Sequence, residues 1–159
     1  MSAANILVVY YSRTGNTRRL AQAIASALHC DIEEIGEARE RSGFVEFIKS
    51  FFEAIRGHHA PIEAVRHDPA AYNLLVVGTP VWAGSVSTPI RSYLAIHKNS
   101  FPDVAFFCTL EHAGSDGAFA EMQNLVGKVP RARCAVKAND VAAGNLEGRV
   151  NKFMQQLGV

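Results

Sequence analysis

Two short runs, ILVVYY at residues 6–11 and LLVVG at residues 74–78, are apolar at every position rather than at every second one. A strand with two apolar faces has to be covered on both sides, as the central strands of a parallel sheet are covered by helices. Runs of this kind predict four buried strands, at residues 5–11, 73–79, 104–110 and 132–138. A weaker run at residues 31–35, in which charged and apolar residues alternate, predicts a short edge strand.

Between these runs, apolar residues recur at the spacing of helices that bury one face. The repeating residues are Leu20, Ile24 and Leu28; Phe44, Ile48, Phe51 and Ile55; Ile90 and Leu94; Phe119, Met122 and Val126; and Leu146, Val150, Phe153, Met154 and Leu157. Strand and helix alternate five times, which predicts right-handed crossovers and a doubly wound α/β sheet. A chain of 159 residues has the length of one domain, so residues 1–159 are expected to form a single domain.

Charge and composition exclude several partners. The chain has 16 Lys and Arg against 15 Asp and Glu, without a basic stripe, which argues against nucleic acid. It has no apolar run near the roughly 20 residues of a membrane span and no signal-peptide pattern. Cys30, Cys108 and Cys134 are odd in number and far apart, which favours a reducing, cytoplasmic location.

The loop after the first predicted strand, SRTGNT at residues 12–17, gathers small hydrogen-bonding side chains around Gly15. A helix that begins near Gly15 or Asn16 would offer unpaired backbone N–H groups and the positive end of its dipole to an anion. The side chains that could add donors are Ser12, Thr14, Asn16 and Thr17. The same residue types also cap helix N-termini, so the loop taken alone is consistent with capping or with anion binding.

The loop lacks the marks of other phosphate sites. It has one glycine and no lysine, which excludes the loops of nucleotide triphosphatases and of dinucleotide-binding proteins. It has no cysteine for a thiolate phosphatase and no acidic residue for a phosphoacceptor domain. A terminal phosphomonoester held by neutral donors is the anion that fits.

Two further loops follow the strands predicted at residues 73–79 and 104–110, which are the third and fourth strands along the chain. One, GTPVWAGSVSTP at residues 78–89, holds the single tryptophan, Trp82, in a turn framed by Gly and Pro; the other is TLEHAGSDGA at residues 109–118. The carboxyl ends of parallel strands meet at one edge of the sheet, so the three loops should converge there. A planar ligand with a phosphomonoester tail fits them, and FMN is the biological candidate.

Three segments, YYSRTGNTRRLA, YNLLVVGTPVWAGSVSTPIRSYL and VAFFCTLEHAGSDGAFAEM, make the chain resemble the flavodoxin-like family over nearly its whole length. The resemblance implies a three-layer αβα sandwich with a five-stranded parallel sheet in the order 2-1-3-4-5. It implies FMN with its phosphate on Ser12, Arg13, Thr14, Gly15, Asn16 and Thr17. It implies an isoalloxazine ring against two further groups of residues, Pro80, Val81, Trp82, Ala83 and Gly84, and Thr109, Leu110, Glu111, His112 and Gly114.

The chain departs from flavodoxin electron carriers in two respects. It is not acidic, and its third loop offers Leu110, Glu111 and His112 where many of those carriers place a second aromatic. We therefore expect one-sided stacking and a reduction potential that is not very low. His112 is interpreted either as an exposed loop residue or as a donor to a reduced flavin or a quinone.

Three functions follow. The first is an electron-transfer protein whose FMN cycles between a reductase and an acceptor, and the short chain favours it. The second is an FMN-dependent NAD(P)H:quinone-type oxidoreductase, which the balanced charge favours. The third is a non-catalytic flavin-binding module.

The aromatic segment FVEFIKSFFEAI carries either a wide core face or a homodimer contact through Phe47 or Phe52. The adjacent pair His58–His59 lies at the end of this helical pattern, where positive groups interact favourably with the helix dipole. The pair is therefore interpreted as capping the helix end or as exposed to solvent rather than as a metal site, because no ligand spacing supports one. No metal site is expected.

Overall fold

The computed structural model describes residues 5–38 and 62–159. Its sheet has the strand order β2-β1-β3-β5-β6, and every neighbouring pair on this path is parallel. The strands are β1 (Ile6–Tyr10), β2 (Asp31–Glu34), β3 (Leu74–Trp82), β5 (Asp103–Leu110) and β6 (Arg133–Lys137). This order confirms the flavodoxin-like five-stranded parallel sheet that the resemblance implied.

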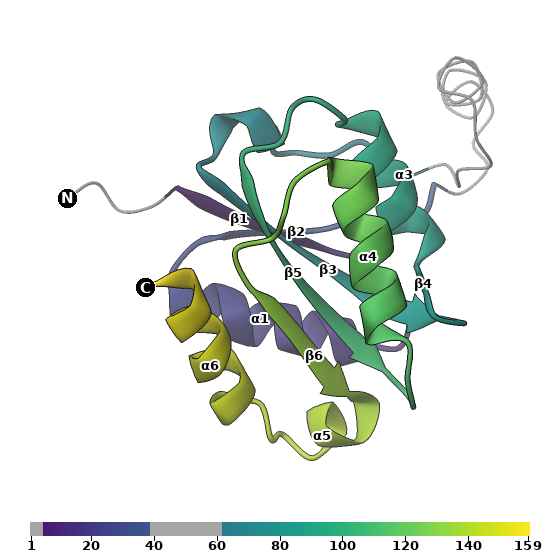
Figure 1. Ribbon diagram of the computed structural model, residues 1–159, viewed down its shortest axis with the longest axis vertical. Helices are drawn as coiled ribbons and strands as arrows, with labels where there is room; N and C mark the ends of the chain where they lie inside the picture. The colour runs from purple at the N-terminus through teal and green to yellow at the C-terminus, as the bar shows by residue number, and fades with distance from the viewer. Residues whose placement is uncertain (1–4, 39–61) are drawn as a thin grey trace.

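Helices cover both faces of this sheet (Figure 1). In the described residues they are α1 (Asn16–Leu28), α3 (Thr88–Ile96), α4 (Ser115–Val126), α5 (Ala138–Ala142) and α6 (Glu147–Leu157), and a 3-10 turn (Pro69–Ala71) precedes β3. α1 and α6 lie on one face, and α3 and α4 lie on the other. The repeat predicted for residues 44–55, with Phe47 and Phe52, and the pair His58–His59 lie outside the described residues.

Two apolar clusters form the core, one on each face of the sheet. Successive residues of β5 divide between them, because side chains alternate along a strand: Phe106 packs with the α3 and α4 side, and Phe107 with the α1 and α6 side. Both phenylalanines are fully buried. This two-sided burial is the physical reason that the central strands are apolar at every position.

Two short elements differ from the sequence-based expectation. β3 continues to Trp82, three residues beyond the predicted end at residue 79, because it pairs there with an antiparallel two-residue strand, β4 (Ser85–Val86). α5 was also missed, because its five residues, ANDVA, are too few to show a helical repeat. Both elements lie at the carboxyl edge of the sheet.

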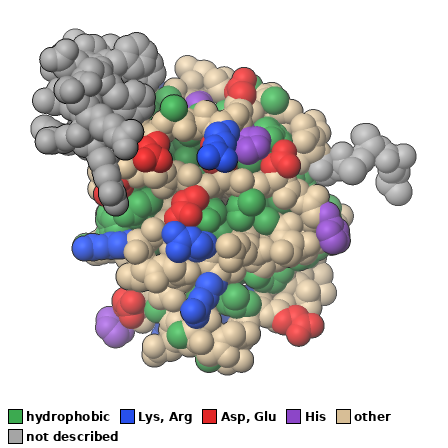
Figure 2. All heavy atoms as spheres, turned by 180° about the vertical axis from the view of Figure 1, so that it is seen from behind, with side chains coloured by type: hydrophobic (Ala, Val, Ile, Leu, Met, Phe, Trp, Pro, Cys, Tyr) green, Lys and Arg blue, Asp and Glu red, His purple; other side chains and the backbone are tan. Residues whose placement is uncertain are grey.

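The surface carries both signs of charge. On the face shown in Figure 2, Lys and Arg side chains lie interspersed with Asp and Glu side chains. Within residues 5–38 and 62–159, no helix has the length and apolarity needed to cross a membrane.

Candidate functional site

The loops after β1, β3 and β5 enclose a cavity of about 400 Å³ at the carboxyl edge of the sheet. We call it the loop cavity. Its lining residues are Arg13, Thr14, Asn16, Thr17, Pro80, Val81, Trp82, Thr109, Leu110, Glu111 and Ala138. All except Ala138 were predicted; Ala138 begins α5 directly after β6, and a search of every strand end at this edge could have found it. The other predicted residues, Ser12, Gly15, Ala83, Gly84, His112 and Gly114, belong to the same loops but do not line the cavity.

The first loop combines capping geometry with free donors. Ser12 is buried, and its Oγ accepts a hydrogen bond from the Gly15 N–H at 3.1 Å. Gly15 has φ 100° and precedes α1 as its N-cap without a side-chain cap. The first intrahelical bond runs from Arg19 N–H to the Gly15 carbonyl, so the N–H groups before Arg19 have no partner within the helix. The first turn carries no acidic residue that would repel an anion.

Trp82 supplies the aromatic wall of the loop cavity. The rings of Tyr11 and Trp82 are nearly perpendicular, with centroids 5.7 Å apart and ring planes at 88°. The Arg13 guanidinium lies 5.8 Å from the Trp82 ring centroid, a cation–π distance. Arg13 is also the one cationic side chain in the lining given above. Trp82 therefore has an aromatic neighbour in Tyr11 and a positive neighbour in Arg13.

Tyr11 is in turn fixed by Glu37. Its hydroxyl donates a hydrogen bond to Glu37 Oε1 at 2.6 Å. Burial, and then this bond to a carboxylate, raises the pKa of Tyr11 to about 12. The phenol therefore stays protonated at neutral pH, and the Tyr11 ring beside Trp82 keeps its charge state in the physiological range.

The turn after Trp82 is a tight hairpin. Ala83 and Gly84 both have positive φ, at 49° and 76°, and they connect the paired residues Trp82 and Ser85. Two central residues with positive φ match the right-handed twist of the flanking strands. Trp82 was expected in a loop beyond the strand; it is instead the last residue of β3, so its backbone is held by strand pairing.

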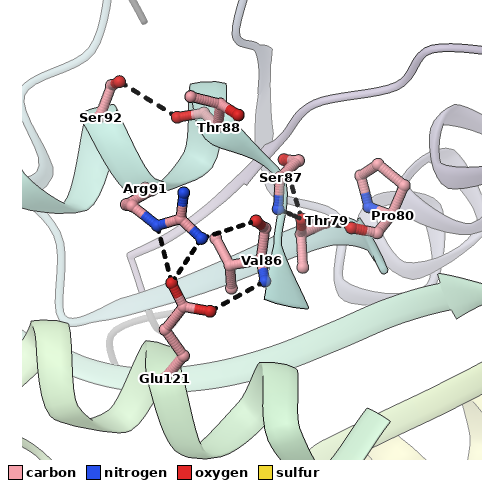
Figure 3. A network of polar contacts seen from close by, with 8 residues as sticks. All are labelled: Thr79, Pro80, Val86, Ser87, Thr88, Arg91, Ser92 and Glu121. Atoms are coloured by element: carbon pink, nitrogen blue, oxygen red, sulfur yellow. Dashed lines mark hydrogen bonds and ion pairs between the residues drawn. The ribbon is translucent and has the colours of Figure 1, made fainter. Parts of the chain in front are cut away.

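Side chains from two helices hold the hairpin in place (Figure 3). The Val86 N–H donates to Glu121 Oε2 of α4 at 3.1 Å, and the Val86 carbonyl accepts from Arg91 of α3 at 3.3 Å. Arg91 and Glu121 also form an ion pair at 2.7 Å. On the inner side, the buried Thr79 Oγ1 accepts from the Ser87 N–H at 3.0 Å. Both backbone groups of Val86 thus depend on one side-chain pair.

Replacing Glu121 by alanine is expected to lower the free energy of unfolding by about 1 kcal/mol, because it leaves the Val86 N–H and the Arg91 guanidinium without their shared acceptor. We also expect the affinity for FMN to fall a fewfold, since the hairpin carries Trp82. Urea denaturation and FMN titration measure the two effects. Asp103→Asn is the matched control, because its pair with Arg131 is exposed and 3.9 Å long; equal losses in both variants would contradict the role of Glu121.

The third loop is open. Glu111 and His112 are exposed, and Glu111 but not His112 lines the loop cavity. Leu110 is buried at the end of β5. The loop therefore gives the cavity an aliphatic and an acidic side chain, whereas Trp82 is the one aromatic that the described part of the chain places in its lining.

This donor set fits FMN. Unpaired N–H groups and hydroxyls at the start of α1 suit a phosphomonoester, and the flat Trp82 ring suits an isoalloxazine. Arg13 adds a positive charge beside the same cavity.

Comparison with known proteins agrees with this fit. The chain matches the NADPH-dependent FMN reductase family over residues 4–145. No curated protein sequence matches it significantly. A flavoprotein from Lactobacillus acidophilus NCFM, solved in complex with FMN, has 22% identity and a TM-score of 0.64, with 91% of this chain and 99% of that chain covered.

Two other solved structures have the same fold. An NADH:FMN oxidoreductase (EmoB), in its apo form, has 13% identity and a TM-score of 0.58, with 98% and 90% of the two chains covered. Oxidised flavodoxin 2 from Bacillus cereus has 17% identity and a TM-score of 0.53, with 94% and 100% covered. Because the family match spans most of the chain, this protein belongs to the NADPH-dependent FMN reductase family, as an FMN-binding protein of flavodoxin-like fold.

Proposed function

We propose that the protein is an FMN-dependent oxidoreductase that takes electrons from NADPH or NADH and passes them to a small quinone-like acceptor. One observation carries the proposal: among residues 5–38 and 62–159, the lining of the loop cavity has a single aromatic side chain, Trp82, and its third-loop members are Leu110 and Glu111. A flavin stacked on Trp82 alone would leave its other face open to a flat substrate. The family match to NADPH-dependent FMN reductases supports the same reaction class.

Within this proposal the three loops have separate tasks. Residues 12–17 bind the phosphate with backbone N–H groups and hydroxyls, and residues 80–84 and 109–114 hold the ring system. Bound FMN supplies the redox chemistry, and the protein positions it and sets its surroundings. Arg13 brings a positive charge to the cavity, which favours negative charge in the ligand. Residues 1–159 act as one FMN-binding domain in this scheme.

The test begins with the protein saturated with FMN, desalted, and mixed with NADPH without oxygen. We expect the yellow absorbance of the oxidised flavin to bleach within the mixing time of a conventional assay, and to return on addition of a soluble quinone. NADH in place of NADPH shows which nicotinamide is preferred. A Trp82→Ala variant serves as the site control: it should bind FMN more weakly because the stacking surface is lost. Flavin that stays oxidised with both nicotinamides would contradict the proposal.

A second candidate is an electron carrier between proteins, and the exposure of Glu111 and His112 in the third loop favours it. A protein partner could approach the site over this loop without a bound nicotinamide. In the same experiment, the carrier stays oxidised with NADPH but is reduced when a flavodoxin reductase is added. The two functions therefore give opposite results with one reagent.

A further inference from the structure

Two buried threonine hydroxyls meet between the first loop and the end of β5. Thr17 is the second residue of α1, and Thr109 is the next-to-last residue of β5. Their Oγ1 atoms are 2.7 Å apart, and either atom can be the donor. The exposed fractions of Thr17 and Thr109 are 2% and 4%, and both residues line the loop cavity. This contact joins the loop that follows β1 to the strand that leads to the third loop.

The direction of this hydrogen bond decides what Thr17 can offer a ligand. A hydroxyl has one proton and two lone pairs. If Thr17 donates to Thr109, its proton is already used. If Thr109 donates to Thr17, the Thr17 proton is free, while its oxygen stays fixed by the bond that it accepts. An anion at the start of α1 selects the second arrangement, because a phosphomonoester near neutral pH is mainly a dianion with acceptor oxygens.

We propose that Thr109 is a positioning residue for the FMN phosphate: it donates its proton to Thr17 and so leaves the Thr17 hydroxyl free to donate to the phosphate. The inference rests on the proposed function of residues 12–17 as the phosphate site. It assigns Thr109 to the phosphate end of the loop cavity, whereas the family resemblance implies contact with the isoalloxazine.

Loss of Thr109 would release the Thr17 side chain. In a helix, threonine divides between two rotamers, because one of them lets the hydroxyl bond to a backbone carbonyl three or four residues earlier. For Thr17 that direction leads back into residues 13 and 14 of the loop. The 2.7 Å contact with Thr109 opposes this rotation. Its removal should therefore weaken binding of the phosphate while the ring site is unchanged.

Dissociation constants for FMN and for riboflavin, which lacks the phosphate, separate the two ends of the ligand. We expect Thr109→Val to raise the FMN constant about tenfold and to change the riboflavin constant by less than about twofold. Thr109→Ser keeps the hydroxyl and should retain most of the FMN affinity. Thr17→Val should weaken FMN binding at least as much as Thr109→Val.

The double variant Thr17→Val/Thr109→Val gives a second readout. If Thr109 acts only through Thr17, the double variant binds FMN no more weakly than Thr17→Val alone. Circular dichroism and thermal unfolding verify that each variant is folded, and Thr109→Ala replaces Thr109→Val if the valine variant fails to fold. The FMN-specific loss is expected from either.

Three results would overturn the inference. If Thr109→Val weakens FMN and riboflavin equally, Thr109 belongs to the ring site. If it weakens neither, the threonine pair has no part in binding. A wild-type protein that binds FMN and riboflavin with equal affinity would overturn the phosphate site itself, and the inference with it; in the first two cases, the proposed function stands.

Discussion

Replacing Gly78 by alanine is expected to lower the free energy of unfolding by about 3 kcal/mol or more, a large part of the 5–15 kcal/mol typical of a domain. Gly78 lies in β3 directly opposite Phe107 of β5. A Cβ atom at Gly78 would lie 2.0 Å from Cζ of the Phe107 ring and 2.1 Å from Cε2. Phe107 is fully buried against the α1 and α6 side, so its ring cannot swing into solvent. Urea denaturation measures the loss.

A second substitution tests whether this clash is the cause. Phe107→Leu removes the ring atoms that the new methyl group would meet, so Gly78→Ala/Phe107→Leu should be more stable than Gly78→Ala alone. Gly148→Ala is the control: a Cβ there meets nothing within 4 Å, and stability should be unchanged or raised by up to about 1 kcal/mol. A double variant less stable than Gly78→Ala would contradict the steric explanation.

The sequence predicted the architecture because burial on both faces leaves a direct trace in composition. The runs at residues 6–11 and 74–78 are apolar throughout, and they form β1 and the first part of β3 between two helical layers. The strand order could be taken only from the family resemblance, because periodicity does not record which strands are neighbours. The loops that converge on the cavity followed from the rule that parallel strands end at one edge.

The sequence could not show how the site is held together. Thr17 and Thr109 are far apart in the sequence and are brought together only by the fold. A threonine at either position does not by itself predict which residue it contacts. The same holds for Arg91 and Glu121, which look like ordinary surface charges on two separate helices. The strand β4 has only two residues, SV, which are too few to show a strand pattern. It is held by the Arg91–Glu121 pair and by its pairing with β3, and neither contact can be predicted from those two residues.

Gly114 connects the third loop to the hairpin that carries Trp82. A Cβ atom at Gly114 would lie 2.7 Å from the Cα of Gly84 and 3.3 Å from Cγ1 of Val81. The first neighbour is backbone and cannot change rotamer. Gly114 also has φ 107°, which an L side chain rarely adopts. Alanine at this position therefore has to push the hairpin tip away from the start of α4 in addition to straining its own backbone.

We expect Gly114→Ala to lower the free energy of unfolding by about 3 kcal/mol, from backbone strain of about 1–2 kcal/mol and the displaced contact. We also expect the FMN dissociation constant to rise at least about tenfold, because Trp82 moves with the hairpin. A change of that size is on the order of the energy of one aromatic contact. Gly127 separates the two causes: its φ is 76°, and a Cβ there meets nothing within 4 Å. Gly127→Ala should therefore show the strain alone, with unchanged FMN affinity. If the two variants lose the same stability and both keep FMN, the close approach of Gly114 to Gly84 does not position Trp82.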